Sequence, residues 1–198
     1  MRGSEIARGL SEIMKNYKHI PDETLMRFLQ RSKDESAFNE LYERYSQRLL
    51  YFMFKMLGQD EAKAQDFLQD VFLKIITAPE KFDPSKNFKT WIFTVAANLC
   101  KNTYRQSKPI QIELHESIVS DQYKSDDLLD QQFFHSALAD RLNELLPVYK
   151  EAFILRYHEG LSLKEIGEVV GAPLGTVKSR LHSALRILSH ELEHFKQN

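Results

Sequence analysis

Apolar residues recur at intervals of three and four positions through most of this chain, and this spacing predicts helices. The first half of the sequence is predicted to form four helices, over residues 22–31, 35–57, 60–76 and 88–106. Pro79 and Pro84 interrupt the pattern, so we expect a loop over 77–87. No stretch shows the sustained alternation that a half-buried strand requires. The fold class is therefore predicted to be all-α.

The apolar positions of each predicted helix fall on one face, which is the candidate core. In the longest helix they are Phe38, Leu41, Tyr42, Tyr45, Leu49, Phe52, Met53 and Met56. In the helix over 60–76 they are Phe67, Leu68, Val71, Phe72 and Ile75. In the helix over 88–106 they are Phe88, Trp91, Ile92, Val95, Leu99 and Cys100, so Trp91 is assigned to the core.

Residues 161–188 predict two short amphipathic helices joined by a tight turn, preceded by helices over 128–146 and 147–158. Apolar residues lie at helical spacing on both sides of Gly171-Ala172-Pro173, first as Leu163, Ile166, Val169 and Val170 and then as Val177, Leu181, Leu185 and Leu188. Ser162 and Glu165 fit a capping box at the start of the first helix. Pro147 suits a first helical position, and Gly160 suits a C-terminal cap. This arrangement is typical of a helix-turn-helix.

The second helix of this pair turns a polar face away from its apolar stripe, made of Lys178, Ser179, Arg180, His182, Ser183 and Arg186. Small, hydroxylic and cationic side chains suit the major groove of DNA, because they allow close approach and can bond phosphates and base edges. The alternative is an ordinary helical hairpin with a solvated polar face, since helix-turn-helix patterns often occur by chance.

Charge is segregated around the middle of the chain. Residues 84–112 hold no acid but five bases, namely Lys86, Lys89, Lys101, Arg105 and Lys108. Residues 113–130 hold six acids against Lys124 alone, without apolar periodicity. Such a composition is typical of a flexible linker. We therefore expect an N-terminal tail over 1–20, a helical domain over 21–110, an acidic linker over 111–130 and a second helical domain over 131–198. From its charge alone, the acidic linker could either cover the acid-free segment as a lid or serve as a hinge between the two domains.

Overall composition narrows the class of protein. The chain has 198 residues, 42% of them hydrophobic, and a formal net charge of −1, so any nucleic-acid site must arise from local segregation of charge. Cys100 is the only cysteine, which excludes an internal disulfide. We find no signal peptide and no apolar run long enough to cross a membrane, and expect a cytoplasmic protein. His190-Glu191-Leu192-Glu193-His194 matches a zinc-peptidase pattern, but no third ligand follows, and we expect no metal site.

Two further surfaces have the chemistry of binding sites. Asp66, Gln69 and Asp70 share one face of their helix, where they could pair with cations of a partner or lie solvated. On the helix over 88–106, Asn98, Lys101 and Arg105 share a face without any acid. Cations meet phosphates and amides read base edges, so this face, with Lys86 in the loop, suits single-stranded DNA. Phe82, also in the loop, is a candidate for contact with an unstacked base.

Several motifs together resemble the extracytoplasmic-function (ECF) class of bacterial sigma factors, from about Pro21 to Phe195. Gly175-Thr176-Val177-Lys178-Ser179-Arg180-Leu181 is similar to that family's DNA-reading helix. Ala64-Gln65-Asp66-Phe67-Leu68-Gln69-Asp70-Val71-Phe72 resembles its polymerase-binding helix. The family also has a segment that opens the downstream promoter element. Four stretches of this chain are similar to it, namely Lys81-Phe82-Asp83, Phe88-Lys89-Thr90-Trp91-Ile92-Phe93, Asn98-Leu99 and Tyr104-Arg105.

The resemblance implies a non-enzymatic initiation subunit, without a cofactor, that binds core RNA polymerase and promoter DNA and is silenced by an anti-sigma factor. It implies polymerase contacts by Asp66, Gln69, Asp70 and Phe72. It implies contacts with the downstream element by Phe82, Lys86, Asn98, Lys101 and Arg105. Upstream-element contacts are implied for Thr176, Lys178, Ser179, Arg180, His182 and Arg186.

The chain departs from the family pattern at three positions. It carries Ala97, Asn102 and Gln65 where the family often has Arg, Asp and a carboxylate. These departures bear on the promoter sequence it prefers. The alternative function is a stand-alone helix-turn-helix regulator that never engages polymerase.

Overall fold

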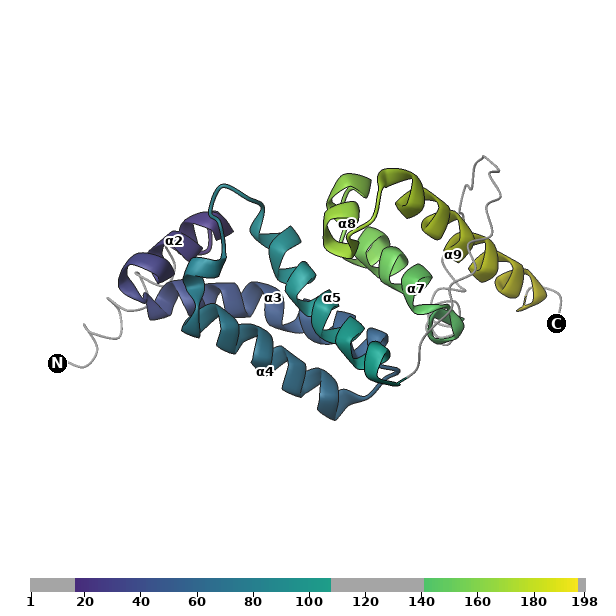
Figure 1. Ribbon diagram of the computed structural model, residues 1–198, viewed down its shortest axis with the longest axis horizontal. Helices are drawn as coiled ribbons and strands as arrows, with labels where there is room; N and C mark the ends of the chain where they lie inside the picture. The colour runs from purple at the N-terminus through teal and green to yellow at the C-terminus, as the bar shows by residue number, and fades with distance from the viewer. Residues whose placement is uncertain (1–16, 108–140, 196–198) are drawn as a thin grey trace, which may run out of the picture.

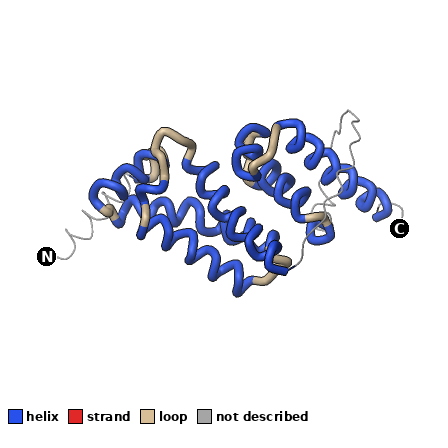
Figure 2. The backbone as a smooth tube through the Cα atoms, viewed as in Figure 1, coloured by secondary structure: helices blue, strands red, loops and turns tan. Residues whose placement is uncertain are grey.

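The computed structural model describes residues 17–107 and 141–195, except the side chains of 104–107 and 190–195, and these residues form two helical domains (Figure 1). The N-terminal domain contains α2 (Asp22–Ser32), α3 (Glu35–Met56), α4 (Glu61–Thr77), the short 3-10 helix η1 (Pro79–Lys81) and α5 (Phe88–Ser107). The C-terminal domain contains α7 (Pro147–Phe153), the π-helical turn η2 (Ile154–His158), α8 (Leu163–Val170) and α9 (Leu174–Phe195). No strand occurs in the described residues, so the predicted all-α fold is confirmed (Figure 2).

The predicted helices of the N-terminal domain agree with these bounds to within one or two residues, and α7 with η2 spans the helix predicted over 147–158. Helix α9 continues to Phe195, past the pair of helices predicted within 161–188. Most of the predicted helix over 128–146, and the whole predicted linker over 111–130, lie outside the described residues. Within the described ranges, no helix combines the length and the apolar character that a membrane span would need.

Side chains cap the helices where the sequence changes from loop to helix. Asp34 accepts hydrogen bonds from the backbone N–H groups of Ser36 and Ala37, and Asp60 accepts one from Lys63, so α3 and α4 begin at carboxylate caps. Asn87 Oδ1 accepts from the N–H of Thr90 at 2.8 Å and from its hydroxyl at 3.1 Å. These side chains satisfy N–H groups that the first turn of a helix leaves unpaired.

The N-terminal core is rich in aromatic rings. Phe52 and Phe93 pack edge to face with ring centroids 5.6 Å apart, joining α3 to α5. Leu41, Leu49 and Met53 are fully buried on the inner face of α3, as predicted. Tyr42 was predicted to lie on the same face, but it is 44% exposed, and its ring packs against Phe72 at the edge of the core. The predicted apolar face of α3 was therefore one position too broad.

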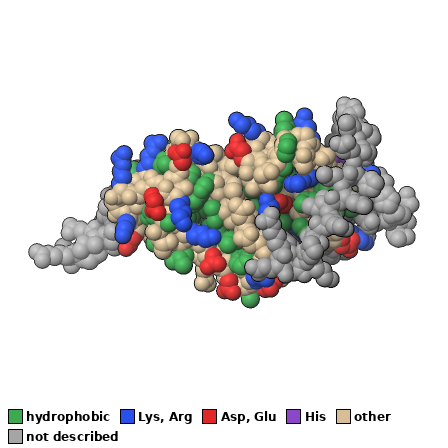
Figure 3. All heavy atoms as spheres, viewed as in Figure 1, with side chains coloured by type: hydrophobic (Ala, Val, Ile, Leu, Met, Phe, Trp, Pro, Cys, Tyr) green, Lys and Arg blue, Asp and Glu red, His purple; other side chains and the backbone are tan. Residues whose placement is uncertain are grey.

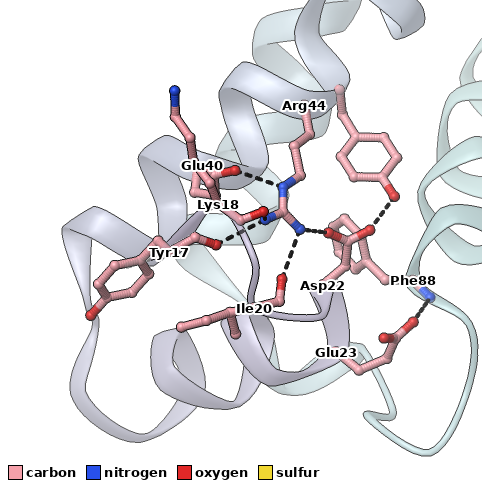
Figure 4. Close-up of polar contacts among 9 residues, drawn as sticks. Tyr17, Lys18, Ile20, Asp22, Glu23, Glu40, Arg44 and Phe88 are labelled. Carbon is pink, nitrogen blue, oxygen red and sulfur yellow. Dashed lines mark hydrogen bonds and ion pairs between the residues drawn. The ribbon is translucent and has the colours of Figure 1, made fainter. Parts of the chain in front are cut away.

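Arg44 of α3 joins the segment before α2 to the rest of the domain (Figure 4). Its guanidinium donates hydrogen bonds to Glu40 at 2.7 Å and to the backbone oxygens of Tyr17, Ile20 and Lys18 at 2.9, 2.9 and 3.0 Å. It also pairs with Asp22, which accepts a hydrogen bond from the hydroxyl of Tyr45. A planar guanidinium can serve so many acceptors because its N–H groups point in fixed, divergent directions.

The two domains pack against one another through α5 and α8, which lie side by side in Figure 1. Buried residues of both domains form one continuous apolar cluster, in which Ile154, Leu161 and Ile166 of the C-terminal domain join the helices of the N-terminal domain. Separate domains with a linker were predicted from the sequence, whereas this shared interface was not.

Candidate nucleic-acid and polymerase interfaces

The helix-turn-helix forms as predicted, with a capping box at its start. Ser162 Oγ accepts a hydrogen bond from the N–H of Glu165 at 3.3 Å, and Glu165 Oε2 accepts one from the N–H of Ser162 at 2.8 Å. Helix α8 ends at Gly171 with φ +68°, a left-handed conformation that glycine adopts without a steric penalty. A Cβ on Gly167 would lie 2.9 Å from the carbonyl oxygen of Ala172, so a glycine there lets α8 approach the turn.

The buried side of α9 consists of Val177, Leu181, Ala184 and Leu188. Leu185, predicted to belong to this stripe, is 41% exposed, because Ala184 takes the inward position. Lys178, Ser179 and Arg186 are exposed, and Thr176, Arg180 and His182 are half-buried. Ser179 Oγ donates to the helix's own carbonyl at Thr176, at 3.0 Å. The surface next to Gly175 is open, with nothing within 4 Å of a Cβ built there.

On α4, Asp66, Gln69 and Asp70 are exposed along one face, while Ala64, Leu68, Val71 and Ile75 are buried on the other. Figure 3 shows acidic side chains along the edge of the molecule where α4 runs. The same face carries two exposed apolar residues that the sequence reasoning missed, Leu73 at 57% and Ile76 at 48%. Carboxylates next to exposed aliphatic side chains are suited to a protein partner, because a docking surface combines an apolar centre with a polar rim.

Phe72 was expected to contact polymerase, but it is only 4% exposed. Its ring centroid lies 5.9 Å from that of Phe38 and 4.7 Å from that of Tyr42, so it anchors α4 to α3 from inside. Phe72 is thus a core residue that positions the exposed face of α4. The prediction that Phe72 itself contacts polymerase is corrected, because its ring is buried.

Phe82 was expected to reach an unstacked base, and this is also corrected, because the ring is 1% exposed. It packs against Phe88 and Trp91 with centroid distances of 5.3 and 5.2 Å. The amide of Gln30 donates to the carbonyl oxygens of Phe82 at 2.8 Å and Pro79 at 2.9 Å, which fixes the loop. Trp91, predicted to be core, is half-buried. Trp91 nevertheless packs against the N-terminal core, and Phe82 is the more enclosed of the two rings.

The remaining candidates for downstream DNA are divided by the structure. Lys86 and Asn98 are exposed, whereas the side chain of Arg105 lies outside the described residues. Lys101 Nζ lies 3.2 Å from Oε1 of Glu151 and donates to the carbonyl oxygen of Val170 at 3.3 Å. Both partners belong to the C-terminal domain. Lys101 thus takes part in the domain interface in this conformation.

Electrostatics at this interface follow from burial. Burial raises the pKa of the Glu151 carboxyl, and the nearby charges of Lys101 and Arg180 oppose that rise. Desolvation lowers the pKa of Lys89, and the neighbouring charge of Arg48 lowers it further. Burial also raises the pKa of the Cys100 thiol to about 12, with a smaller contribution from the negative charge of Glu151.

Among the described residues, no group of His, Cys, Asp and Glu side chains could hold a metal ion.

These features define a class of protein with two helical domains, one of which presents a helix-turn-helix. Residues 41–109 match the Sigma-70 region 2 family, and residues 135–188 match the Sigma-70 region 4 family. The chain is 33% identical over 170 residues to the ECF RNA polymerase sigma factor RpoE of Cereibacter sphaeroides, covering 84% of this chain and 92% of that one. It is 31% identical over 163 residues to the RNA polymerase sigma factor CarQ of Myxococcus xanthus, covering 80% and 92%.

A solved structure agrees with these sequence relationships. The sigma factor RpoE of Bartonella quintana, solved in complex with the anti-sigma factor NepR, superposes with a TM-score of 0.59 and 28% identity over 79% of this chain and 96% of that one. The chain belongs to the ECF class of RNA polymerase sigma factors. It therefore directs promoter-specific initiation of transcription, and sigma factors are in general non-enzymatic DNA-binding initiation factors.

Proposed function

We propose that the two domains divide promoter recognition between them. The C-terminal domain reads the upstream (minus-thirty-five) element as duplex through α9, with Thr176, Lys178, Ser179, Arg180, His182 and Arg186 facing the DNA. The N-terminal domain docks on core polymerase through Asp66, Gln69 and Asp70 of α4. It holds the melted downstream (minus-ten) element through Lys86, Asn98, Lys101 and Arg105. The chain contributes binding and catalyses no reaction of its own.

The observation that carries this proposal is the exposed face of α4. Its two carboxylates form no ion pair within the described part of the chain, and Leu73 and Ile76 extend the same face. A regulator that acts without polymerase would have no need for such a face in a Sigma-70 region 2 domain. Two contacts on one DNA molecule also raise the effective concentration of each, so neither domain needs high affinity alone.

We also propose that an anti-sigma factor silences this chain. The support is that RpoE of Bartonella quintana, whose fold it shares, was solved with the anti-sigma factor NepR. The two domains of this chain offer a partner a composite surface, because α5 and α8 lie in contact.

Run-off transcription tests the proposal. Core RNA polymerase is combined with the purified chain and a set of candidate promoters, and transcripts are compared with those of core enzyme alone. We expect transcripts that depend on the chain and start at a defined position. Co-purification with core polymerase separates this function from the stand-alone regulator, which would bind duplex DNA but leave core enzyme unbound.

A further inference from the structure

Helices α3 and α7, one from each domain, meet at two lysines, Lys55 and Lys150. The two residues are 6% and 5% exposed, although lysine is almost never fully buried unless it is paired. Neither lysine belongs to the surfaces proposed above for DNA or polymerase. Two positive charges are thus enclosed where the domains touch.

Neither ammonium group forms an ion pair within the described residues. Nζ of Lys150 donates to two backbone oxygens, that of Asn143 at 3.1 Å and that of Lys55 at 3.5 Å. Nζ of Lys55 lies 5.8 Å from the ring centroids of Tyr51 and Phe54. Carbonyl oxygens and ring faces attract a cation, but they carry no net charge. The two ammonium groups are therefore buried without a negative charge to balance them.

The end of α3 compensates for these charges only in part. Lys55 lies in the last turn of that helix, where the helix dipole places roughly half a negative elementary charge. Burial lowers the pKa of Lys150, and the positive charge of Lys55 lowers it further. Both effects mean that the protonated form of Lys150 is less stable in this position than in water.

Other contacts across the same interface are attractive. Arg48 of α3 donates to the carboxylate of Glu159 at 2.9 Å, and Lys101 of α5 lies 3.2 Å from the carboxylate of Glu151. The apolar cluster that both domains share adds to this attraction. The contact between α3 and α7 differs, because separating these helices would return water to two unpaired ammonium groups. The packed arrangement thus contains one element that favours its own separation.

We infer that Lys55 and Lys150 oppose the packing of the two domains and so set how readily the domains separate. The two like charges offset part of the attraction from the ion pairs and the apolar cluster. The contact is therefore weaker than its enclosed apolar surface alone would make it. Because neither lysine belongs to a proposed DNA or polymerase surface, the proposed function holds or fails independently of this pair.

The test removes each charge in the full-length chain. Lys55→Met and Lys150→Met keep an unbranched, flexible side chain but lose the charge. The matched controls are Lys74→Met in α4 and Lys164→Met in α8, which change exposed lysines of the same two domains.

Energy transfer between two fluorescent dyes measures the separation of the domains. Every chain carries the dyes at Glu43→Cys and Glu168→Cys, two exposed positions in different domains, and is labelled under native conditions, in which Cys100 is buried. Urea is then titrated, and far-UV circular dichroism of the same samples follows the unfolding of the helices.

We expect each of the two interface Met variants to need more urea for separation than wild type does. At the wild-type midpoint, the equilibrium constant for separation should fall at least about fivefold, the lower end of the gain when buried charges are replaced by apolar side chains. The two control variants should stay within about twofold of wild type.

Lys55→Glu distinguishes repulsion between charges from a general gain in apolar packing. A carboxylate facing Lys150 supplies the missing negative charge, so this variant should raise the urea midpoint for separation when Lys150 is present. In the Lys150→Met background the same carboxylate would be buried without a partner, and the midpoint should fall.

Two results would overturn the inference. Unchanged or lower midpoints in both interface Met variants, relative to the controls, would show that the two charges do not oppose packing. An equal effect of Lys55→Glu with and without Lys150 would show that the lysines do not act as a pair. Lys55→Gln and Lys150→Gln, which also remove the charge, are measured in the same way if circular dichroism shows that a Met variant has lost its helices. Run-off transcription by the wild-type chain tests the proposed function separately.

Discussion

The guanidinium of Arg44 and the carboxylate of Asp22 form an ion pair that ties α3 to the start of α2 (Figure 4). Asp22 lies in the first turn of α2, and the same carboxylate accepts a hydrogen bond from Tyr45. Arg44 also holds three backbone oxygens of the segment before α2. One side chain thus fixes the position of α2, whose Glu23 accepts a hydrogen bond from the N–H of Phe88 at 2.9 Å and so orients the start of α5.

Replacing Arg44 should therefore destabilise the chain through several lost hydrogen bonds. We expect Arg44→Met to lower the free energy of unfolding by about 2 kcal/mol, because it leaves partly buried acceptors without a donor. Arg31→Met is the control, since Arg31 is exposed at the end of α2, and it should change stability by about 0.5 kcal/mol or less. Urea denaturation followed by circular dichroism measures both. Equal effects would contradict the role of Arg44.

Charge reversal on α4 should abolish binding to core polymerase without unfolding the chain. Exposed charges contribute little to stability but can prevent a partner from docking by like-charge repulsion. We expect Asp66→Lys with Asp70→Lys to lose co-purification with core enzyme while the melting temperature stays near that of wild type. Glu43→Lys with Glu80→Lys, two exposed acids of the same domain, should bind as wild type does. Unchanged binding by the α4 variant would remove that helix from the polymerase interface.

Two glycines of the helix-turn-helix should respond oppositely to alanine. In Gly167→Ala, the new Cβ would lie 2.9 Å from the Ala172 oxygen, so α8 and the turn must move apart. We expect a loss of about 1–3 kcal/mol in the free energy of unfolding. In Gly175→Ala the Cβ meets open space, and the higher helix propensity of alanine should stabilise the chain by up to about 1 kcal/mol. Thermal melts of the two variants should move in opposite directions, and a shared direction would contradict the close approach at Gly167.

The helices of this fold were predictable because their signals are local. The spacing of apolar residues, the caps at Asp34 and Asp60, and the Ser162–Glu165 capping box all act within a few residues of one another. Periodicity also assigned α9 its inner face, apart from Leu185. Its error there is understandable, because Ala184 and Leu185 are neighbours and only packing decides which of them is enclosed.

Contacts between distant segments were not predictable in the same way. Phe82 lies in a loop, where the pattern gives no phase, and its burial depends on Gln30 holding the loop against α2. Arg48 and Glu159 are 111 residues apart, and nothing in either local sequence indicates the other. Exposure on α4 was predicted for Asp66, Gln69 and Asp70, whereas the sequence reasoning assigned Leu73 and Ile76 to neither the core nor the surface. Burial of an isolated apolar residue is set by its neighbours in space.

Alkaline pH should weaken the fold through Cys100. Its folded pKa of about 12 is above the unfolded value of about 8.5, so the stability it contributes is complete below about pH 8.5 and is lost as pH rises toward 12. The free energy of unfolding should fall by up to about 1.4 kcal/mol for each unit of pH. Burial also raises the pKa of Tyr45 and Tyr51, so the tyrosines add to the loss only above about pH 10.

The measurement compares urea denaturation of wild type and Cys100→Ala between about pH 8 and pH 10, the window before the tyrosines titrate. Wild type should lose more stability, or gain less, per pH unit across this window than the variant, because Lys89 and Lys150, whose pKa values are lowered by desolvation, contribute equally to both chains. The two chains are compared by the slope of the free energy of unfolding against pH. The free energies themselves are not compared, because alanine leaves a small cavity that lowers stability at every pH. Parallel slopes would show that the thiol does not titrate as its burial requires.

The recognition helix should give the most direct measurement of DNA contact. Lys178 is exposed on α9 and Arg180 is half-buried beside it. Arg180→Ala should weaken binding to upstream-element duplex by about 1–3 kcal/mol if its guanidinium bonds a guanine through both nitrogens, and by less if it meets only phosphate. Lys178→Ala should lower the slope of log affinity against log salt by about one, because one phosphate contact and its released counterion are lost. Lys74→Ala, an exposed lysine of α4 in the other domain, is the matched control and should leave both quantities unchanged. If the double variant Lys178→Ala, Arg180→Ala bound the duplex as tightly as the Lys74 control, with the same salt slope, α9 would not be the reading helix.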